Sequence, residues 1–208
     1  MRITKDAEER RNEILDVAEK MFLEKGFENT STVDIAIAIK IAKGTLYYHF
    51  KTKNEMMNAI IERRVSRVHE ELKKIAENKS IYFVDRIVMI FKMTKFSDIN
   101  NEQNLTYLHN SENVYMHQKM QEAMIATFAP ILMKLSQEGE KEGIVHSPYL
   151  YQSIEMLLVY GNLIFDNNRL RGMRNEEIIE NINAFIFHIE ILLGTPPGTF
   201  AALKEILS

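Results

Sequence analysis

Apolar residues recur at helical spacing along this chain, and that spacing restricts the fold more than any other feature. Near the amino terminus Ile14, Ala18, Met21 and Phe22 fall at i, i+4, i+7 and i+8, which places them on one face of a helix. The chain of 208 residues holds only 8 Gly and 4 Pro, and most of its β-branched residues follow the helical rather than the alternating period. The sequence therefore predicts an all-α protein that is long enough to bury a substantial core.

A short second helix and a short third helix are predicted directly after the first. Ser31 followed by Asp34 fits a capping box, in which each side chain accepts a hydrogen bond from the backbone N–H group of the other residue. The apolar rhythm of the helix that they open breaks after about two turns, at Lys40. A further helix begins near Ala42, so that residues 31–50 have the helix-turn-helix pattern.

The third helix is predicted to have an inner and an outer side. Leu46 and Phe50 are four residues apart, share a face and are expected to enter the core. Thr52 followed by Glu55 forms a second capping box, which opens a long helix that continues to Ile75. The other side chains of the third helix are left to point away from the core.

Positive charge is concentrated in this part of an acidic chain. The whole chain has 26 Lys and Arg against 29 Asp and Glu, whereas residues 35–54 contain lysines but no acidic residue. A local basic surface on an acidic body suits a polyanion that binds at one end of the molecule. Taken alone, such a run is usually an ordinary solvated face beside half-buried tyrosines. Here it coincides with a helix-turn-helix pattern, so we predict DNA binding.

The side chains of the third helix have the chemistry that contacts with a duplex require. Lys43 lies at the start of the helix, where its ammonium group and the free backbone N–H groups attract phosphate. Gly44 has no side chain, so the backbone can approach the DNA closely. Thr45 and Tyr47 offer hydroxyl groups to a phosphate or a base edge. The residues placed to hold the sugar-phosphate chain are Tyr48, His49, Lys51 and Lys53.

At these positions the sequence resembles the DNA-binding domain of TetR-family transcriptional regulators. The resemblance rests on Thr32-Val33, Ile35-Ala36, Lys43-Gly44-Thr45-Leu46-Tyr47-Tyr48-His49-Phe50 and Lys51-Thr52-Lys53, after a helix end at Lys25-Gly26-Phe27. It implies a DNA-binding domain over residues 1–52 and a helical effector-binding and dimerisation domain over residues 53–208. The side chains implied to reach the major groove are those of Thr32, Lys43, Thr45 and Tyr47. Those implied to reach the phosphates are Tyr48, His49 and Lys53.

This resemblance leads to one prediction, and the sequence departs from the family pattern at two positions. Lys53→Ala is expected to weaken binding to all DNA sequences alike and to lower the log-log salt slope by about 1 unit. Lys40 stands where the family mostly has a turn glycine, and Ala42 stands where a Ser or Thr often caps the recognition helix. A lost Ser or Thr cap typically costs about 1 kcal/mol.

The later part of the chain suggests self-association. Two apolar stripes occur near its end, and from periodicity alone each is explained by the core of its own chain. The resemblance implies instead that the last two long helices of each protomer pack into a four-helix bundle in a dimer. The two recognition helices would then bind two half-sites of a palindromic operator, about 34 Å or a multiple of that distance apart. The residues assigned to this interface are Leu150, Ile154, Leu158, Ile182, Phe185 and Ile189.

Methionine and aromatic residues between Ile87 and Phe128 suggest a ligand pocket. Methionine adapts to irregular shapes, so such a lining suits a bulky apolar molecule with one or two polar anchors. A methionine-rich core explains any one of these residues equally. The candidate lining residues are Met89, Met93, Tyr107, His109, Tyr115, Met120, Met124, Phe128, Asn162 and Phe165.

Composition argues against several other functions. Cysteine is absent, which removes disulfides, thiolate metal sites and Cys nucleophiles. The histidines show no metal-ligand spacing, and without a Gly-rich phosphate loop or a Ser/His/Asp grouping nothing nominates a catalytic residue or a cofactor. The polar amino terminus and the short apolar run at Ile154–Phe165 predict a cytoplasmic protein that does not enter a membrane.

The function expected on these grounds is that of a homodimeric repressor. It would leave its operator when a small, largely apolar molecule binds the larger domain. The alternative is a DNA-binding regulator without an effector, whose large domain only dimerises or docks a protein around a collapsed core.

Overall fold

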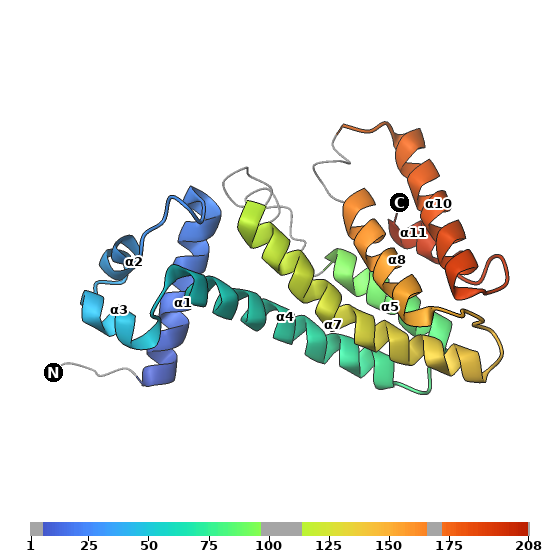
Figure 1. Cartoon of the computed structure of the whole chain (residues 1–208), viewed down its shortest axis with the longest axis horizontal. Coiled ribbons are helices and arrows are strands. Elements are labelled where there is room, and N and C mark those ends of the chain that lie inside the picture. Colours follow the sequence, from blue (N-terminus) through green and yellow to red (C-terminus); the bar gives the residue numbers. More distant parts are fainter. Residues whose placement is uncertain (1–5, 97–113, 166–171, 208) are drawn as a thin grey trace. The chain divides into compact units, whose positions relative to one another are not determined.

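The computed structural model describes residues 6–96, 114–165 and 172–207, and within these ranges the chain is helical, with turns between the helices (Figure 1). The described ranges contain no strand, and the predicted all-α fold is confirmed. The helices are α1 (Ala7–Lys25), α2 (Thr32–Ala38), α3 (Lys43–His49), α4 (Lys53–Glu77), α5 (Phe83–Phe96), α7 (Val114–Lys141), α8 (Leu150–Ile164), α10 (Asn175–Leu193) and α11 (Leu203–Leu207).

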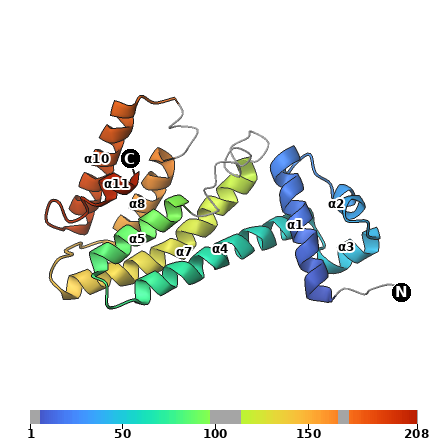
Figure 2. The ribbon, with the colours of Figure 1, turned by 180° about the vertical axis from the view of Figure 1, so that it is seen from behind.

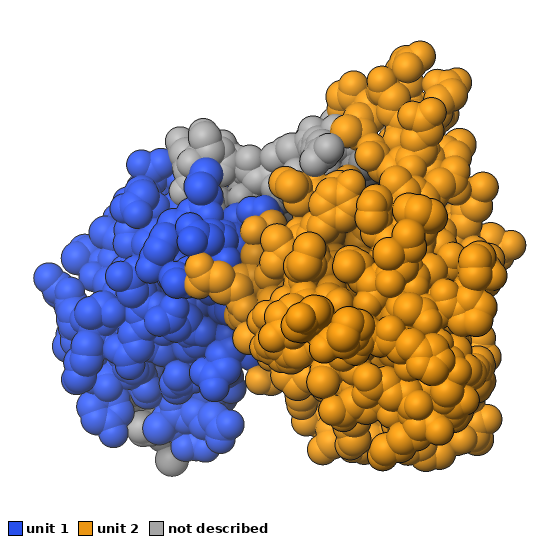
Figure 3. All heavy atoms as spheres, turned by 45° about the vertical axis from the view of Figure 1, so that its right-hand side comes forward, with its two compact units in different colours: residues 1–64, 102–120 blue, residues 65–101, 121–208 orange. Residues whose placement is uncertain are grey.

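The chain forms two compact units (Figure 3). Unit 1 consists of residues 1–64 and 102–120, and unit 2 consists of residues 65–101 and 121–208. The first half of α4 and the first two turns of α7 therefore belong to unit 1, while the remainder of both helices belongs to unit 2.

Unit 1 is built around the apolar faces that the sequence predicts. In α1 Ile14, Ala18 and Phe22 are fully buried, and α2 packs against both α1 and α3. Leu46 and Phe50 are also fully buried, as predicted. These two residues anchor α3 from its inner side, so its other side chains are available for other contacts.

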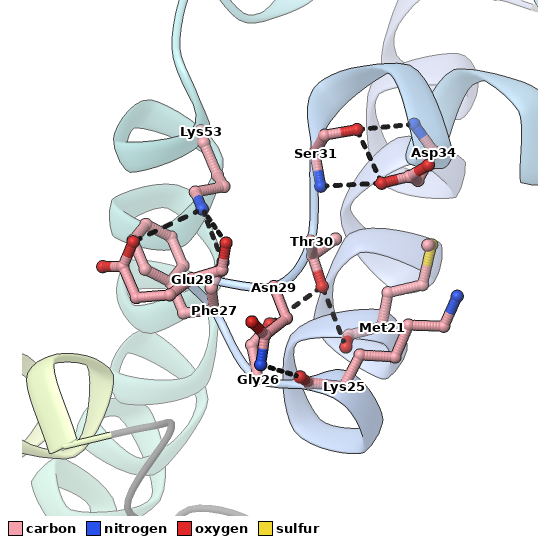
Figure 4. A network of polar contacts seen from close by, with 10 residues as sticks. All are labelled: Met21, Lys25, Gly26, Phe27, Glu28, Asn29, Thr30, Ser31, Asp34 and Lys53. Carbon is pink, nitrogen blue, oxygen red and sulfur yellow. Dashed lines mark hydrogen bonds and ion pairs between the residues drawn. The ribbon is translucent and has the colours of Figure 1, made fainter.

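The capping box predicted at the start of α2 is present. Asp34 N–H donates to Ser31 Oγ at 3.1 Å, and Ser31 N–H donates to a carboxylate oxygen of Asp34 at 3.0 Å (Figure 4). The hydrogen bonds from Ser31 lower the pKa of Asp34 below its ordinary value, because they stabilise the ionised carboxylate. Two of the backbone N–H groups at the start of α2 are thus satisfied locally.

The turn between α2 and α3 has the geometry that a glycine would adopt most easily. Ile41 N–H donates to Ala36 O and Lys40 N–H donates to Ile37 O, both at 3.0 Å, which is the Schellman pattern at a helix end. Lys40 holds the left-handed position with φ of 56°. Downstream, Ala42 begins α3 without a side-chain cap.

Lys40→Gly is therefore expected to stabilise the protein by about 0.5 to 1 kcal/mol. Left-handed geometry costs a residue with a Cβ about 1 to 2 kcal/mol, and the greater backbone freedom of unfolded glycine offsets about 0.5 to 1 kcal/mol of the gain. Urea unfolding measures the change, with Lys40→Ala as the control because alanine keeps the Cβ atom. If the two variants were equally stable, backbone geometry at this position would not limit stability.

The long helix α4 begins at the second predicted capping site. Glu55 N–H donates to Thr52 Oγ1 at 3.0 Å, as a capping box requires. The carboxylate of Glu55 accepts from Lys51 N–H at 2.6 Å, one residue before the expected donor. Farther along the chain α7 continues through Pro130 as a single helix, although proline has no N–H group for the hydrogen bond of a helix interior.

Unit 2 packs α10 against α8, and α11 against α5 and α10 (Figure 2). Phe185 of α10 is fully buried at the centre of this packing, with its ring centroid 5.2 Å from that of Phe165 and 6.2 Å from that of Phe91. A Cβ atom on Gly161 of α8 would lie 3.1 Å from the same ring, so the glycine allows α8 and α10 to approach closely.

A buried ion pair lies within unit 2 at the end of α4. Arg86 is nearly fully buried, donates to Ala76 O at 2.6 Å and pairs with Glu138 at 2.5 Å. Burial opposes ionisation of Glu138, but hydrogen bonds from Arg86 and Lys79 outweigh it and lower the pKa of Glu138. The pair joins the last turns of α4 to α5 and α7 within this unit.

Candidate DNA-binding site

The outer face of α3 is open to a partner. Lys43, Gly44, Thr45 and Tyr48 are all exposed, and 75% of the surface of Tyr48 is accessible. A Cβ atom on Gly44 would meet no atom within 4 Å, so the packing of unit 1 does not require glycine there. The missing side chain instead leaves the backbone open to close approach from outside.

The hydroxyl groups of Thr32 and Tyr47 lie together on one side of α3. Thr32 Oγ1 and Tyr47 Oη are 3.2 Å apart, and both residues are half-buried. Lys43 Nζ lies 5.6 Å from the centroid of the Tyr47 ring. The structure thus gathers three of the side chains predicted to face the major groove, one from α2 and two from α3.

His49 lies at the other end of α3 and is half-buried. Burial lowers the pKa of His49, and the positive charges of Arg11 and Arg10 on α1 lower it further. The ring is therefore a neutral hydrogen-bonding group at neutral pH. Arg11 lies outside the basic run of residues 35–54, and its position near α3 could not be predicted from the sequence because the two segments meet only in the fold.

Lys53 is engaged within unit 1. Its ammonium group donates to Phe27 O at 2.5 Å and to Glu28 O at 3.3 Å, and it lies 4.3 Å from the centroid of the Phe27 ring (Figure 4). These contacts join the first turn of α4 to the loop after α1. These hydrogen bonds to backbone carbonyl groups support a structural role for Lys53, and its assignment as a phosphate contact stays a prediction.

Lys53→Ala is expected to lower the free energy of unfolding by about 2 kcal/mol, the usual contribution of hydrogen bonds from a charged group. The salt slope of DNA binding should stay as in the unmodified chain, in contrast to the drop that the sequence alone predicts. Lys43→Ala is the matched control, since it removes the same charge from an exposed position. It should lower the slope by about 0.9 for each bound protomer and leave stability nearly unchanged. A lowered slope for Lys53→Ala at full stability would restore the phosphate assignment.

Comparison with known proteins agrees with this geometry. A family model described as bacterial regulatory proteins, tetR family, matches residues 14–60, and a model of the tetracyclin repressor-like C-terminal domain matches residues 92–188. The chain belongs to the TetR family of transcriptional regulators. The resemblance seen in the Lys43-to-Phe50 segment is confirmed, and it extends to the larger part of the chain.

Curated relatives of this TetR-family chain match it over a limited length. An HTH-type transcriptional regulator of Staphylococcus aureus (strain USA300) is 39% identical over 74 residues, which are 36% of this chain and 40% of that protein. The regulator from strain NCTC 8325 / PS 47 matches to the same extent. The chain thus spans about 40% of the length of these relatives.

Solved structures share the fold over nearly the whole chain. The SmeT–triclosan complex has a TM-score of 0.63 and 20% identity, covering 91% of this chain and 93% of that one. Salmonella enterica GusR has a TM-score of 0.63 and 20% identity, covering 93% of this chain and 100% of that one. A second SmeT structure has a TM-score of 0.60 and 19% identity, covering 94% of this chain and 95% of that one. That SmeT is described as the repressor of the Stenotrophomonas maltophilia multidrug efflux pump SmeDEF.

The side chains assigned from the sequence to a dimer interface lie mainly in the core of unit 2. Five of them are buried there, and Leu158 is partly buried against the same core. Side chains already covered by their own unit offer little area to a second protomer, so this burial argues against the predicted interface residues. The five buried residues are Leu150, Ile154, Ile182, Phe185 and Ile189.

A different set of apolar side chains faces outward on the same two helices. Met156, Val159 and Leu163 are exposed on α8 at helical spacing, and Phe187 and Ile191 are exposed on α10. We call these five residues, together with Tyr160 and Ile179, the α8–α10 face. Because α8 and α10 pack against each other, their exposed residues lie on adjacent helices of one unit (Figures 1 and 2).

The candidate pocket residues do not form one group. Tyr115 and Met120 belong to unit 1, where the Tyr115 ring centroid lies 6.1 Å from that of Phe27 and Met120 is buried. In unit 2 Phe128 is buried in the core, while Met93, Met124 and Phe165 pack partly buried against it. Asn162 is half-buried and Met89 is exposed on α5, and Tyr107 and His109 lie outside the described residues.

The described ranges hold neither a candidate metal centre nor a candidate membrane span. No group of three or more His, Cys, Asp or Glu side chains in residues 6–96, 114–165 and 172–207 is arranged to hold a metal ion. Of the helices in these ranges, none has the length and apolar character needed to span a membrane.

Proposed function

We propose that this TetR-family chain is a transcriptional repressor that binds double-stranded DNA through the exposed face of α3. The observation that carries the proposal is the division of α3 into two sides. Leu46 and Phe50 are buried within unit 1, whereas Lys43, Thr45 and Tyr48 are exposed beside a glycine whose missing side chain serves no internal packing. Cationic and hydroxyl groups on an exposed helix suit the phosphates and base edges of the major groove.

The proposed DNA contacts are Thr32, Lys43, Gly44, Thr45, Tyr47, Tyr48 and His49. The shared hydrogen bond between Thr32 and Tyr47 orients both hydroxyl groups before DNA arrives, which reduces the entropy lost on binding. Residues 1–52 serve as the DNA-binding domain in this proposal, and residues 53–208 serve dimerisation and effector binding.

Dimerisation through the α8–α10 face is part of the proposal. Large apolar side chains that remain exposed on adjacent helices mark an interaction surface. A two-fold axis through such a face pairs it with itself and produces a four-helix bundle. Two copies of α3 would then read two half-sites of a palindromic operator.

A small, largely apolar effector is proposed to release the repressor from DNA. The support comes from Met93, Met124 and Phe165, which pack partly buried in unit 2 and offer an adaptable lining, with Asn162 as a polar anchor. SmeT, a structural neighbour, has been solved in complex with triclosan. A coupling of about 1 to 3 kcal/mol between the two sites would be enough to change operator occupancy strongly.

Selection of binding sites from random duplex DNA tests the proposal directly. Recovery of a palindromic sequence, bound in preference to a shuffled duplex, is the expected result. Titration of lipophilic and cationic compounds into the preformed complex then tests the effector. If no pocket binder changed the DNA affinity, the chain would be a regulator without a small-molecule effector. If no duplex were bound even in dilute buffer, the proposed function would fail.

A further inference from the structure

A second group of positive side chains lies on the side of α3 that faces α1. Arg11 of α1 is exposed, and its guanidinium carbon lies 4.8 Å from the centroid of the Phe50 ring. Phe50 directly follows the last residue of α3 and is fully buried, so its ring holds the guanidinium group beside that end of the helix. The neighbouring Arg10 pairs with Glu13 at 2.5 Å, so its charge is already partly neutralised.

Arg11 places a positive charge beside the end of α3 that carries His49. His49 is the last residue of α3, and the charges of Arg11 and Arg10 act with burial to lower its pKa. Only the arginine charges, not the burial, favour an anion at this place, because a positive potential attracts negative charge. An anion at this end of α3 would meet the guanidinium group of Arg11 from α1 and the imidazole of His49 from α3.

The geometry of α3 places this position opposite the Thr32–Tyr47 pair. Tyr47 and His49 are two residues apart, which is a rotation of about 200° around a helix. Tyr47 meets Thr32 of α2, while Phe50, the residue directly after His49, meets Arg11 of α1. A helix in the major groove has a sugar-phosphate chain on either side of it, so the two positions face different strands.

We propose that Arg11 and His49 together bind a phosphodiester group of the DNA strand that runs along the α1 side of α3. This inference rests on the proposed DNA-binding function and adds a residue outside the helix-turn-helix. The guanidinium group supplies planar N–H donors that match phosphate, and Phe50 fixes its position in advance. Because the contact is to the backbone, it strengthens binding to every sequence.

The test is the salt dependence of binding to a mixed-sequence duplex long enough to span two half-sites. Arg11→Met removes the charge and keeps an apolar stem against Phe50, whereas Arg11→Lys keeps the charge. Lys20→Ala is the matched control, because Lys20 is also an exposed cation of α1. It lies nine residues after Arg11, which is a rotation of about 900°, or two full turns and a half, so it lies on the opposite face of the helix. Circular dichroism before each titration verifies that the variant is folded.

The expected result separates Arg11 from the control. Arg11→Met should lower the log-log salt slope by about 0.9 for each bound protomer, while Arg11→Lys and Lys20→Ala should keep the slope of the unmodified chain. An unchanged slope for folded Arg11→Met would overturn the inference, and so would an equal loss in Lys20→Ala. Failure of the unmodified chain to bind any duplex would refute the proposed function itself, and that result is seen before any variant is made.

Discussion

Phe185→Ala is expected to lower the free energy of unfolding by about 3 to 5 kcal/mol, the usual cost of deleting a buried aromatic ring. The Phe185 ring is fully buried and lies edge-on to Phe165 and Phe91, with Gly161 leaving space for it on α8. Close packing on all sides prevents the surrounding helices from collapsing into the space that alanine would leave. Urea unfolding followed by circular dichroism measures the loss.

Phe185→Leu is the control for this prediction, since it shortens the side chain without emptying the site. It should cost clearly less than the alanine variant. If Phe185 instead lay in an interface, as the sequence stripe suggested, the alanine variant would dissociate the dimer and leave the fold of each protomer intact. A loss below about 1 kcal/mol for Phe185→Ala would therefore contradict the core position.

Phe187→Glu and Ile191→Glu together are expected to produce a monomer that binds duplex DNA on the order of 100-fold less tightly. The exposed fractions of Phe187 and Ile191 are 56% and 59%, so a dimer through the α8–α10 face would bury both side chains. Four carboxylates brought together across a two-fold axis would repel one another and resist desolvation. Loss of the second recognition helix then removes the gain from joining two binding events.

Sedimentation velocity and fluorescence anisotropy measure the two effects in one preparation. Gln137→Glu is the matched control, because it adds a carboxylate at an exposed position of α7 in the same unit. The control should remain dimeric and bind DNA normally. A double variant that still sedimented as a dimer would show that the protomers associate through another surface.

Much of the DNA-binding head could be predicted from the sequence, because its signals are local. The Ser31–Asp34 capping box joins residues three positions apart, and Leu46 and Phe50 share one face of a single helix. Even the two departures from the family pattern have local consequences. Lys40 adopts the left-handed conformation of a turn glycine, and Ala42 begins α3 without a side-chain cap.

The role of Lys53 could not be predicted in this way. Its ammonium group donates to carbonyl groups 26 and 25 positions earlier in the chain, and no local pattern specifies such a partner. Glu190 is a similar case, since its buried carboxylate accepts from Gly198 N–H at 2.9 Å and from Phe200 N–H at 3.0 Å in the chain that follows α10. In a sequence both residues resemble ordinary charged positions.

The sequence by itself determined that the chain is helical, where the helix proposed to read DNA lies and which side of that helix is buried. These properties depend on periodicity and capping, which act within a few residues. Only the tertiary structure decided which apolar stripe of α8 and α10 enters the core and which stays exposed. On α10, for example, Phe185 is fully buried, whereas Phe187, two residues later, is exposed. A helix that is apolar on more than one side has no local property that selects its inner face, because that choice depends on the helices packed against it.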